Sequence, residues 1–90
     1  MPKRNTPYRP TRLPAKLLAI RKRLGLSQSQ MAARLESKVS ASRISEYEHG
    51  VRLPSLLVLL RYSQIVSVHM ETIVDDHVGL EQFQDELEFR

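Results

Sequence analysis

The stretch SQSQMAARLESKVSASRISEYEHGVRLP, residues 27–54, decides which fold this sequence predicts. Its first half opens with Ser27, a residue type that often caps helices, and then places apolar residues on one helical face, namely Met31, Ala32 and Leu35. Its second half opens with Ser40 and turns Ile44 and Tyr47 toward a core. The stretch therefore predicts two short consecutive helices, the second with a small, polar outer face.

A series of residues in and beside this stretch keeps a spacing known from one protein family. In chain order these are GLSQ at 25–28, MA at 31 and 32, IS at 44 and 45, and then Glu48, Gly50 and Pro54. With them the chain resembles the Cro/C1-type helix-turn-helix family, also called the XRE family, from about residue 17 to residue 74. The resemblance implies an all-α, lambda-repressor-like bundle that binds duplex DNA. It also implies an ion pair between Arg21 and Glu48 that braces the first helix against the recognition helix.

One turn departs from the family pattern. Residues 36–39 separate Leu35 from Ser40, two residues more than usual, and no glycine is among them. We expect either a longer second helix or a bulged turn. The angle at which the recognition helix enters a groove stays open for this reason.

Further helices are predicted on both sides of the opening stretch. Apolar residues at helical spacing predict a helix over 15–24, which Gly25 can end in a left-handed conformation. Ser55 can cap a helix from about 56 to 65, and a short helix is expected from about 69 to 74. A chain of 90 residues with 41% hydrophobic content has room for one small core. We therefore expect a single bundle of about five short helices.

Two segments of opposite charge flank this domain, which we place at residues 15–78. Residues 1–14 form a proline-rich basic arm, and eight cations but no acid precede residue 24. Residues 79–90 belong to an acidic end, since seven acids and one cation follow residue 69. A cationic front suits a molecule that neutralises phosphates, whereas the acidic end should point away from nucleic acid.

The second helix of the opening stretch carries the residues that we expect to read DNA. With Ile44 toward the core, steps of about 100° per residue send Ser42 and Glu46 to the opposite face. Because the N-terminal turn of such a helix usually points into the major groove, we expect base contacts from Ala41, Ser42, Arg43 and Glu46. Ala41 suits a thymine methyl group, Arg43 a guanine or a phosphate, and Glu46 a cytosine amino group. Glu46 can instead be a solvated acid or pair with Arg43.

Contacts to the DNA backbone are expected around this helix. The resemblance implies them for Gln28 and Arg52, and we expect them also from Ser29, Lys38 and Ser40. The two serines can equally be simple caps, and Arg52 can be an inert surface residue. The cations of the arm can track the minor groove or the backbone, unless the arm is a disordered solubilising tail; they are Lys3, Arg4, Arg9 and Arg12.

Residues 79–90 place Leu80, Phe83 and Leu87 on one side of an otherwise acidic helix. The pattern fits a sixth helix folded on its own domain, a dimer contact, a peptide that docks on another protein, or a frayed end.

For the whole protein we expect a sequence-specific transcriptional regulator, namely a repressor. We expect it to bind a palindromic site as a homodimer, because one small module binds DNA weakly. The alternatives are an antitoxin-like subunit whose partner is a protein bound through residues 79–90, and a domain of this fold that only binds proteins.

Other classes of protein fit the sequence poorly. It has no cysteine for a disulfide or a Cys-based zinc site, and its longest apolar run, LLVLL at 56–60, is too short to span a bilayer. Its three histidines are dispersed without a metal-binding spacing, and no phosphate-binding glycine loop occurs. We therefore expect no enzymatic activity, no cofactor and no metal, in a soluble cytoplasmic protein without a secretory signal.

Overall fold

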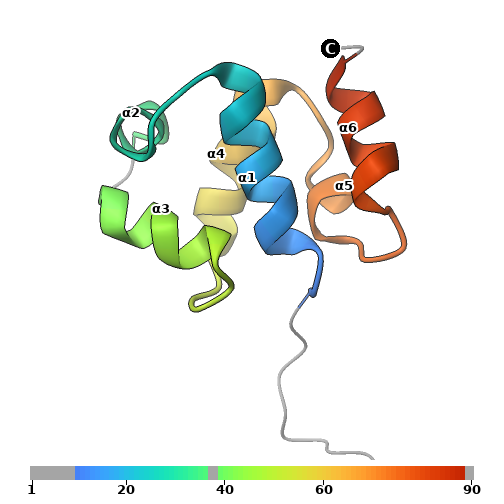
Figure 1. Ribbon diagram of the computed structural model, residues 1–90, viewed down its shortest axis with the longest axis horizontal. Helices are drawn as coiled ribbons and strands as arrows, with labels where there is room; N and C mark the ends of the chain where they lie inside the picture. The colour runs from blue at the N-terminus through green and yellow to red at the C-terminus, as the bar shows by residue number, and fades with distance from the viewer. Residues whose placement is uncertain (1–9, 37–38, 89–90) are drawn as a thin grey trace, which may run out of the picture.

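Six helices make up the described part of the chain, which is residues 10–36 and 39–88 of a computed structural model (Figure 1). They are α1 (Leu13–Leu24), α2 (Gln28–Arg34), α3 (Ala41–Glu48), α4 (Leu56–Val66), α5 (Met70–Val74) and α6 (Leu80–Glu88). No strand occurs in these two ranges, and the all-α class is confirmed. The bundle has one helix more than the expected five, because residues 80–88 also fold. No helix in the described ranges is long and apolar enough to cross a membrane.

Serine caps begin three of the helices where the sequence predicted them. Through their hydroxyl groups, Ser27, Ser40 and Ser55 each accept a hydrogen bond from the backbone N–H three residues further on, at 3.1, 3.2 and 3.3 Å. Each bond satisfies an N–H group that the first turn of a helix leaves without a partner. Gly25 and Gly50 follow the ends of α1 and α3 with φ of 70° and 75°, a left-handed conformation that glycine adopts without strain. These local signals set the helix boundaries.

The first helix begins two residues earlier than predicted, at Leu13. Pro14 can take the second helical position because the N–H that it lacks would have no partner in the first turn. The carboxylate of Asp76 accepts hydrogen bonds from the backbone N–H groups of Thr11 and Arg12, at 2.9 and 3.0 Å. The Arg12 side chain donates to the Asp76 carbonyl. A residue that was expected in a free arm is therefore attached to the folded domain.

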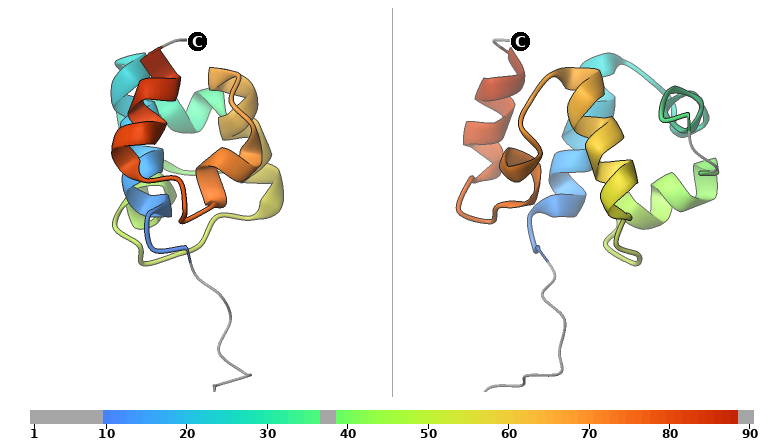
Figure 2. Two further views of the ribbon diagram at one scale, coloured as in Figure 1. Left: turned by 90° about the vertical axis from the view of Figure 1, so that its right-hand side faces the viewer. Right: turned by 180° about the vertical axis from the view of Figure 1, so that it is seen from behind.

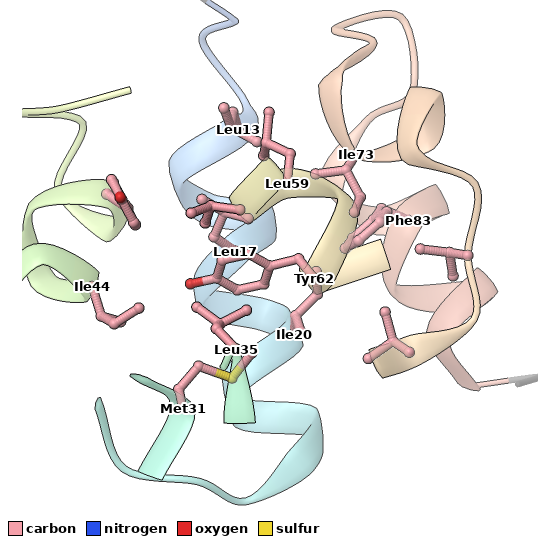
Figure 3. Packing of buried hydrophobic residues seen from close by; sticks show 14 of the residues in the cluster. Leu13, Leu17, Ile20, Met31, Leu35, Ile44, Leu59, Tyr62, Ile73 and Phe83 are labelled. Carbon is pink, nitrogen blue, oxygen red and sulfur yellow. The ribbon is translucent and has the colours of Figure 1, made fainter. Parts of the chain in front are cut away.

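α1 lies at the centre of the hydrophobic core. Figure 1 shows α2 and α3 on one side of it and α5 and α6 on the other. In Figure 3, Ile44 of α3 and Phe83 of α6 point into the core from opposite sides, with Tyr62 of α4 between them. All three side chains are fully buried. Because burying an isoleucine or phenylalanine side chain contributes about 1.5–3 kcal/mol, this packing holds α3 firmly to the bundle.

The turn between α2 and α3 contains a strained residue. α2 ends at Arg34 with Leu35 as its C-cap, so the second helix is not the longer one that we considered. Glu36 follows with φ of 53°, in the left-handed region, where the family pattern has glycine. For a residue with a side chain this conformation costs roughly 1–2 kcal/mol. The longer connection of this chain therefore does not lengthen α2.

The acidic C-terminal segment forms α6 and packs on its own domain. Phe83 and Leu87 are buried in the core, and α6 lies against α1. Of the arrangements considered for residues 79–90, the structure has the sixth helix folded back. Its apolar side is occupied within the molecule, and its outward side carries acids such as Glu81 and Asp85. The amphipathic pattern is thus explained without a protein partner.

Candidate nucleic-acid interface

α3 has one apolar and one polar side. Ile44 and Tyr47 are buried in the core, with 0% and 4% of their surface exposed. On the other side, Ser42 and Arg43 are exposed and Glu46 is partly exposed. α3 also lies at the end of the molecule opposite α6 (Figures 1 and 2). Buried Ile44 and Tyr47 therefore hold α3 to the bundle, while its polar side faces solvent.

The first turn of α3 has small side chains and carries positive charge. Ser40 is extended, with φ of −94° and ψ of 166°, and its hydroxyl accepts the N–H of Arg43 at 3.2 Å. Ala41, which is half-buried, and the exposed Ser42 follow it. Because the N–H groups of a first turn point outward along the helix axis, this end of a helix carries a partial positive charge. Together with the Arg43 guanidinium, the turn is suited to approach an anionic groove.

A largely buried ion pair joins α3 to α1, as the resemblance implied. The Nε of Arg21 lies 2.7 Å from Oε2 of Glu48, and its Nη2 lies 3.0 Å from Oε1, so the two groups meet through two parallel hydrogen bonds. The side chains are 17% and 3% exposed. The hydrogen bonds to Glu48 raise the pKa of the Arg21 guanidinium above its ordinary value. The charged groups of Arg21 and Glu48 therefore hold α3 against α1.

A second set of ion pairs lies on the outer side of α3. Oε1 of Glu46 lies 3.3 Å from Nε of Arg43 and 2.9 Å from Nε of Arg52, the arginine of the loop after α3. These side chains are 39%, 46% and 50% exposed in the order named. The pairing of Glu46 with Arg43, one of the arrangements open from the sequence, is present, and Arg52 joins it. One carboxylate oxygen therefore holds two arginines on the outer surface.

The order of the helices and the placement of the second and third match a known family. A profile of the helix-turn-helix family matches residues 17–73, more than half of the chain. The chain belongs to the Cro/C1-type helix-turn-helix family. Comparison with curated proteins and with solved structures gave no match. As a Cro/C1-type protein it is a DNA-binding regulator, and this family is one of regulators rather than of enzymes.

In this helix-turn-helix domain, the residues expected at the DNA backbone have different surroundings. Ser29 and Ser40 are exposed, and the Ser40 hydroxyl also caps α3. The Gln28 amide donates to Oε1 of Glu48 at 3.2 Å, so a phosphate contact by this side chain has to compete with that bond. Arg52 is held on the outer side of α3 by its ion pair. The remaining candidates lie outside the described residues; they are Lys38, Lys3, Arg4 and Arg9.

Lys16 is buried, although the charge distribution suggested a surface cation. Its Nζ donates to the backbone carbonyls of Thr72 and Asp75, at 2.9 Å each, and lies 5.5 Å from the centroid of the Phe83 ring. These carbonyls belong to the end of α5, where the helix dipole is negative. Burial lowers the pKa of the Lys16 ammonium below its ordinary value. This lysine joins α1, α5 and α6.

Other cations of α1 also face the acidic end of the Cro/C1-type domain. Lys22 and Arg23 line a groove together with Asp85 and Glu88 of α6. The Nε of Arg23 donates to the Leu87 carbonyl at 3.4 Å. The charge pattern of the sequence did not indicate that these two cations lie beside α6. The reason is that α1 lies between α3 and α6, so Lys22 and Arg23 lie on the side that faces α6.

Proposed function

We propose that this domain reads a specific duplex sequence through the major groove and represses transcription by occupying that sequence. The observation that carries the proposal is the outer side of α3, where small, polar and charged side chains are held outward by buried Ile44 and Tyr47. A protein that fills the groove at a promoter excludes other proteins from the same base pairs. Repression is the simplest consequence of such binding.

Base readout is proposed for four residues of α3. Ala41 and Ser42 are small enough for base edges to approach closely, with a thymine methyl group against Ala41. Arg43 can donate two parallel hydrogen bonds to guanine, and Glu46 can accept one from a cytosine amino group. Their position in the first turns of the helix supports these roles, since that part of a recognition helix usually contacts the bases.

Contacts with the phosphates are proposed for residues around α3. Ser29, Ser40 and Arg52 are exposed near or beside this helix, and Gln28 can contribute once it leaves Glu48. We propose further contacts from Lys38 in the turn and from the arm, through Lys3, Arg4 and Arg9. Such contacts position the protein and set the salt dependence of binding, but carry no sequence information.

We also propose that the protein binds as a homodimer. Five exposed apolar residues gather in the loop after α3 and the first turns of α4, at 39–71% exposure; they are Val51, Leu53, Leu56, Leu57 and Leu60. In a two-fold dimer the same surface meets itself, and apolar side chains can do so without charge repulsion. Because this surface begins directly after α3, the contact would fix the spacing of the two recognition helices, and half-sites one helical turn apart require a spacing of roughly 34 Å.

Sedimentation of the full chain tests the dimer surface. Leu57→Glu places a charge in its middle, and we expect this variant to be monomeric at concentrations where the wild type is dimeric. Gln84→Glu is the matched control, because it adds the same charge to the exposed side of α6. Equal self-association of wild type and Leu57→Glu, or a wild type that binds its site as a monomer, would contradict the proposal.

Selection of bound duplexes from a random DNA pool, at two salt concentrations, tests the proposed function. We expect overall binding to fall steeply with salt because counterions compete for the phosphates, while one motif stays enriched. A palindromic motif is the result expected for a homodimer. Recovery of no motif at either concentration, from a protein that is folded by thermal melting, would refute specific DNA reading.

A further inference from the structure

The ion pairs on the outer side of α3 add little to the stability of the fold. Glu46 and its two arginines are between 39% and 50% exposed, and exposed ion pairs typically contribute about 0–1 kcal/mol. Their position is more informative, because all three charges lie on the polar side of α3 or directly after it. The arrangement therefore concerns what this surface binds.

The geometry shows what the carboxylate does to each arginine. Both arginines approach Oε1 of Glu46 through Nε, the atom closest to the stem of the side chain. A guanidinium has five N–H donors, of which four belong to the two terminal nitrogens. In the described part of the chain, the contacts of both arginines with Glu46 run through Nε and no hydrogen bond joins a terminal nitrogen to this carboxylate. Glu46 thus lowers the net charge of the surface and restrains the stems of two arginines without using their terminal donors.

A negative charge at this place opposes the attraction that acts on every duplex. Binding that does not depend on sequence comes almost entirely from phosphates and cations, so an acid among the cations weakens it on all sequences alike. A specific site can compensate when a base donates to the carboxylate or accepts from the restrained arginines. The same acid therefore costs more affinity on a wrong sequence than on the right one.

We propose that Glu46 is the specificity-determining residue of this surface: it holds Arg43 and Arg52 in position and suppresses binding to unrelated DNA. This inference rests on the proposed function, because it needs a duplex that α3 prefers. It adds that discrimination comes partly from a repulsive charge and not only from favourable base contacts.

Glu46→Gln tests the inference, since it removes the charge and keeps the shape. Affinity is measured for the duplex enriched by selection and for an unrelated duplex of equal length, across a series of salt concentrations. We expect the unrelated duplex to bind more tightly and the preference for the enriched one to fall about tenfold. The dependence of log K on log salt should steepen by about one to two, because two arginines become free to neutralise phosphates.

Glu71→Gln is the matched control, because it removes the same charge from the exposed side of α5 at the other end of the molecule. Thermal melts of both variants should coincide with that of the wild type. If Glu46→Gln keeps the wild-type preference, or binds unrelated DNA no better than Glu71→Gln does, the inference is overturned while the proposed function stands. A wild type without any preferred duplex would overturn both.

Discussion

The two ion-pair clusters at α3 use the same kinds of side chain for different tasks. On the inner side, Arg21 and Glu48 meet through two hydrogen bonds and are 17% and 3% exposed. On the outer side, Glu46 is shared by two arginines and every partner is at least 39% exposed. Solvent access, and not residue type, separates the two clusters.

The comparison explains which charges can be exchanged for DNA. An exposed pair contributes about 0–1 kcal/mol, so the outer arginines can leave Glu46 for a base or a phosphate at small cost. Breaking a buried pair by removing one partner costs about 3–5 kcal/mol, because the other charge is left without compensation. The inner pair must therefore persist for α3 to remain in place, and the outer cluster can rearrange on binding.

The largest effect is expected from Arg21→Ala. It leaves the carboxylate of Glu48 buried without its main partner and should lower the free energy of unfolding by about 3–5 kcal/mol. DNA binding should be lost because the domain unfolds. Chemical denaturation measures the change, with Arg43→Ala as the control from the outer cluster. If the two variants unfold at the same denaturant concentration, the structural role of the inner pair is refuted.

A smaller loss of stability is expected from Lys16→Met. Methionine can fill the space of the lysine stem but takes away the hydrogen bonds that Lys16 donates to the carbonyls of Thr72 and Asp75. The Asp75 carbonyl keeps the N–H of Val78 as a donor at 3.0 Å, so we expect a cost of about 1–3 kcal/mol, mainly from the Thr72 carbonyl. Lys22→Met, on the exposed side of the same helix, is the control. Amide hydrogen exchange should also quicken in α5 and α6. Wild-type exchange rates there would show that Lys16 does not join these helices.

Arg43→Ala should affect binding and leave folding unchanged. The affinity for the enriched duplex should fall about tenfold, which corresponds to one lost base contact, while the melting temperature stays that of the wild type. The preference should relax at one position of the motif. A uniform loss on all duplexes would instead indicate a phosphate contact, and an altered melting temperature would mean that the outer cluster is structural.

The smallest effect is expected from Tyr62→Phe. The Tyr62 hydroxyl is buried and has no hydrogen-bond partner among the described protein groups, so its removal should change stability by less than about 1 kcal/mol near neutral pH. Burial raises the pKa of this phenol, with the charge of Glu48 as a second cause. The folded protein therefore keeps the proton above pH of about 10, where the unfolded chain loses it, and the wild type loses stability as the pH rises.

Tyr62→Phe should lack this alkaline loss. The variant and the wild type are compared by urea denaturation near neutral pH and at about pH 11, above the ordinary tyrosine pKa. We expect the variant to be the more stable of the two only at the higher pH. A wild type that is more stable than the variant by several kcal/mol near neutral pH would show that the hydroxyl has a partner.

Local signals in the sequence predicted the helices, but contacts between residues far apart in the chain could not be predicted from it. The caps at Ser27, Ser40 and Ser55 were predictable because a cap and its N–H partner are three residues apart. The hydrogen bonds between Arg12 and Asp76 join residues 64 apart, and no local pattern reports them.

Other features left partial signals. Lys16 follows Leu13 by three residues and precedes Ile20 by four, so it shares their apolar face, which was the sign that it is buried. The amphipathic pattern of residues 79–90 predicted an apolar side with Phe83 and Leu87 but not the surface that covers it. Of the candidate site, the outer position of Ser42 and Arg43 followed from helical spacing. The pairing of Arg52 with Glu46 could not be predicted in this way, because it depends on the path of the loop after α3.

The central claim is that the polar side of α3 lies in the groove of a duplex, and amide chemical-shift mapping tests it most directly. The enriched duplex is added to isotope-labelled protein, and the shift of each backbone amide is followed. The account predicts the largest changes over residues 40–46 and in the first turn of α2, with little change in α6. Largest changes in α5 and α6, with α3 unaffected, would contradict it.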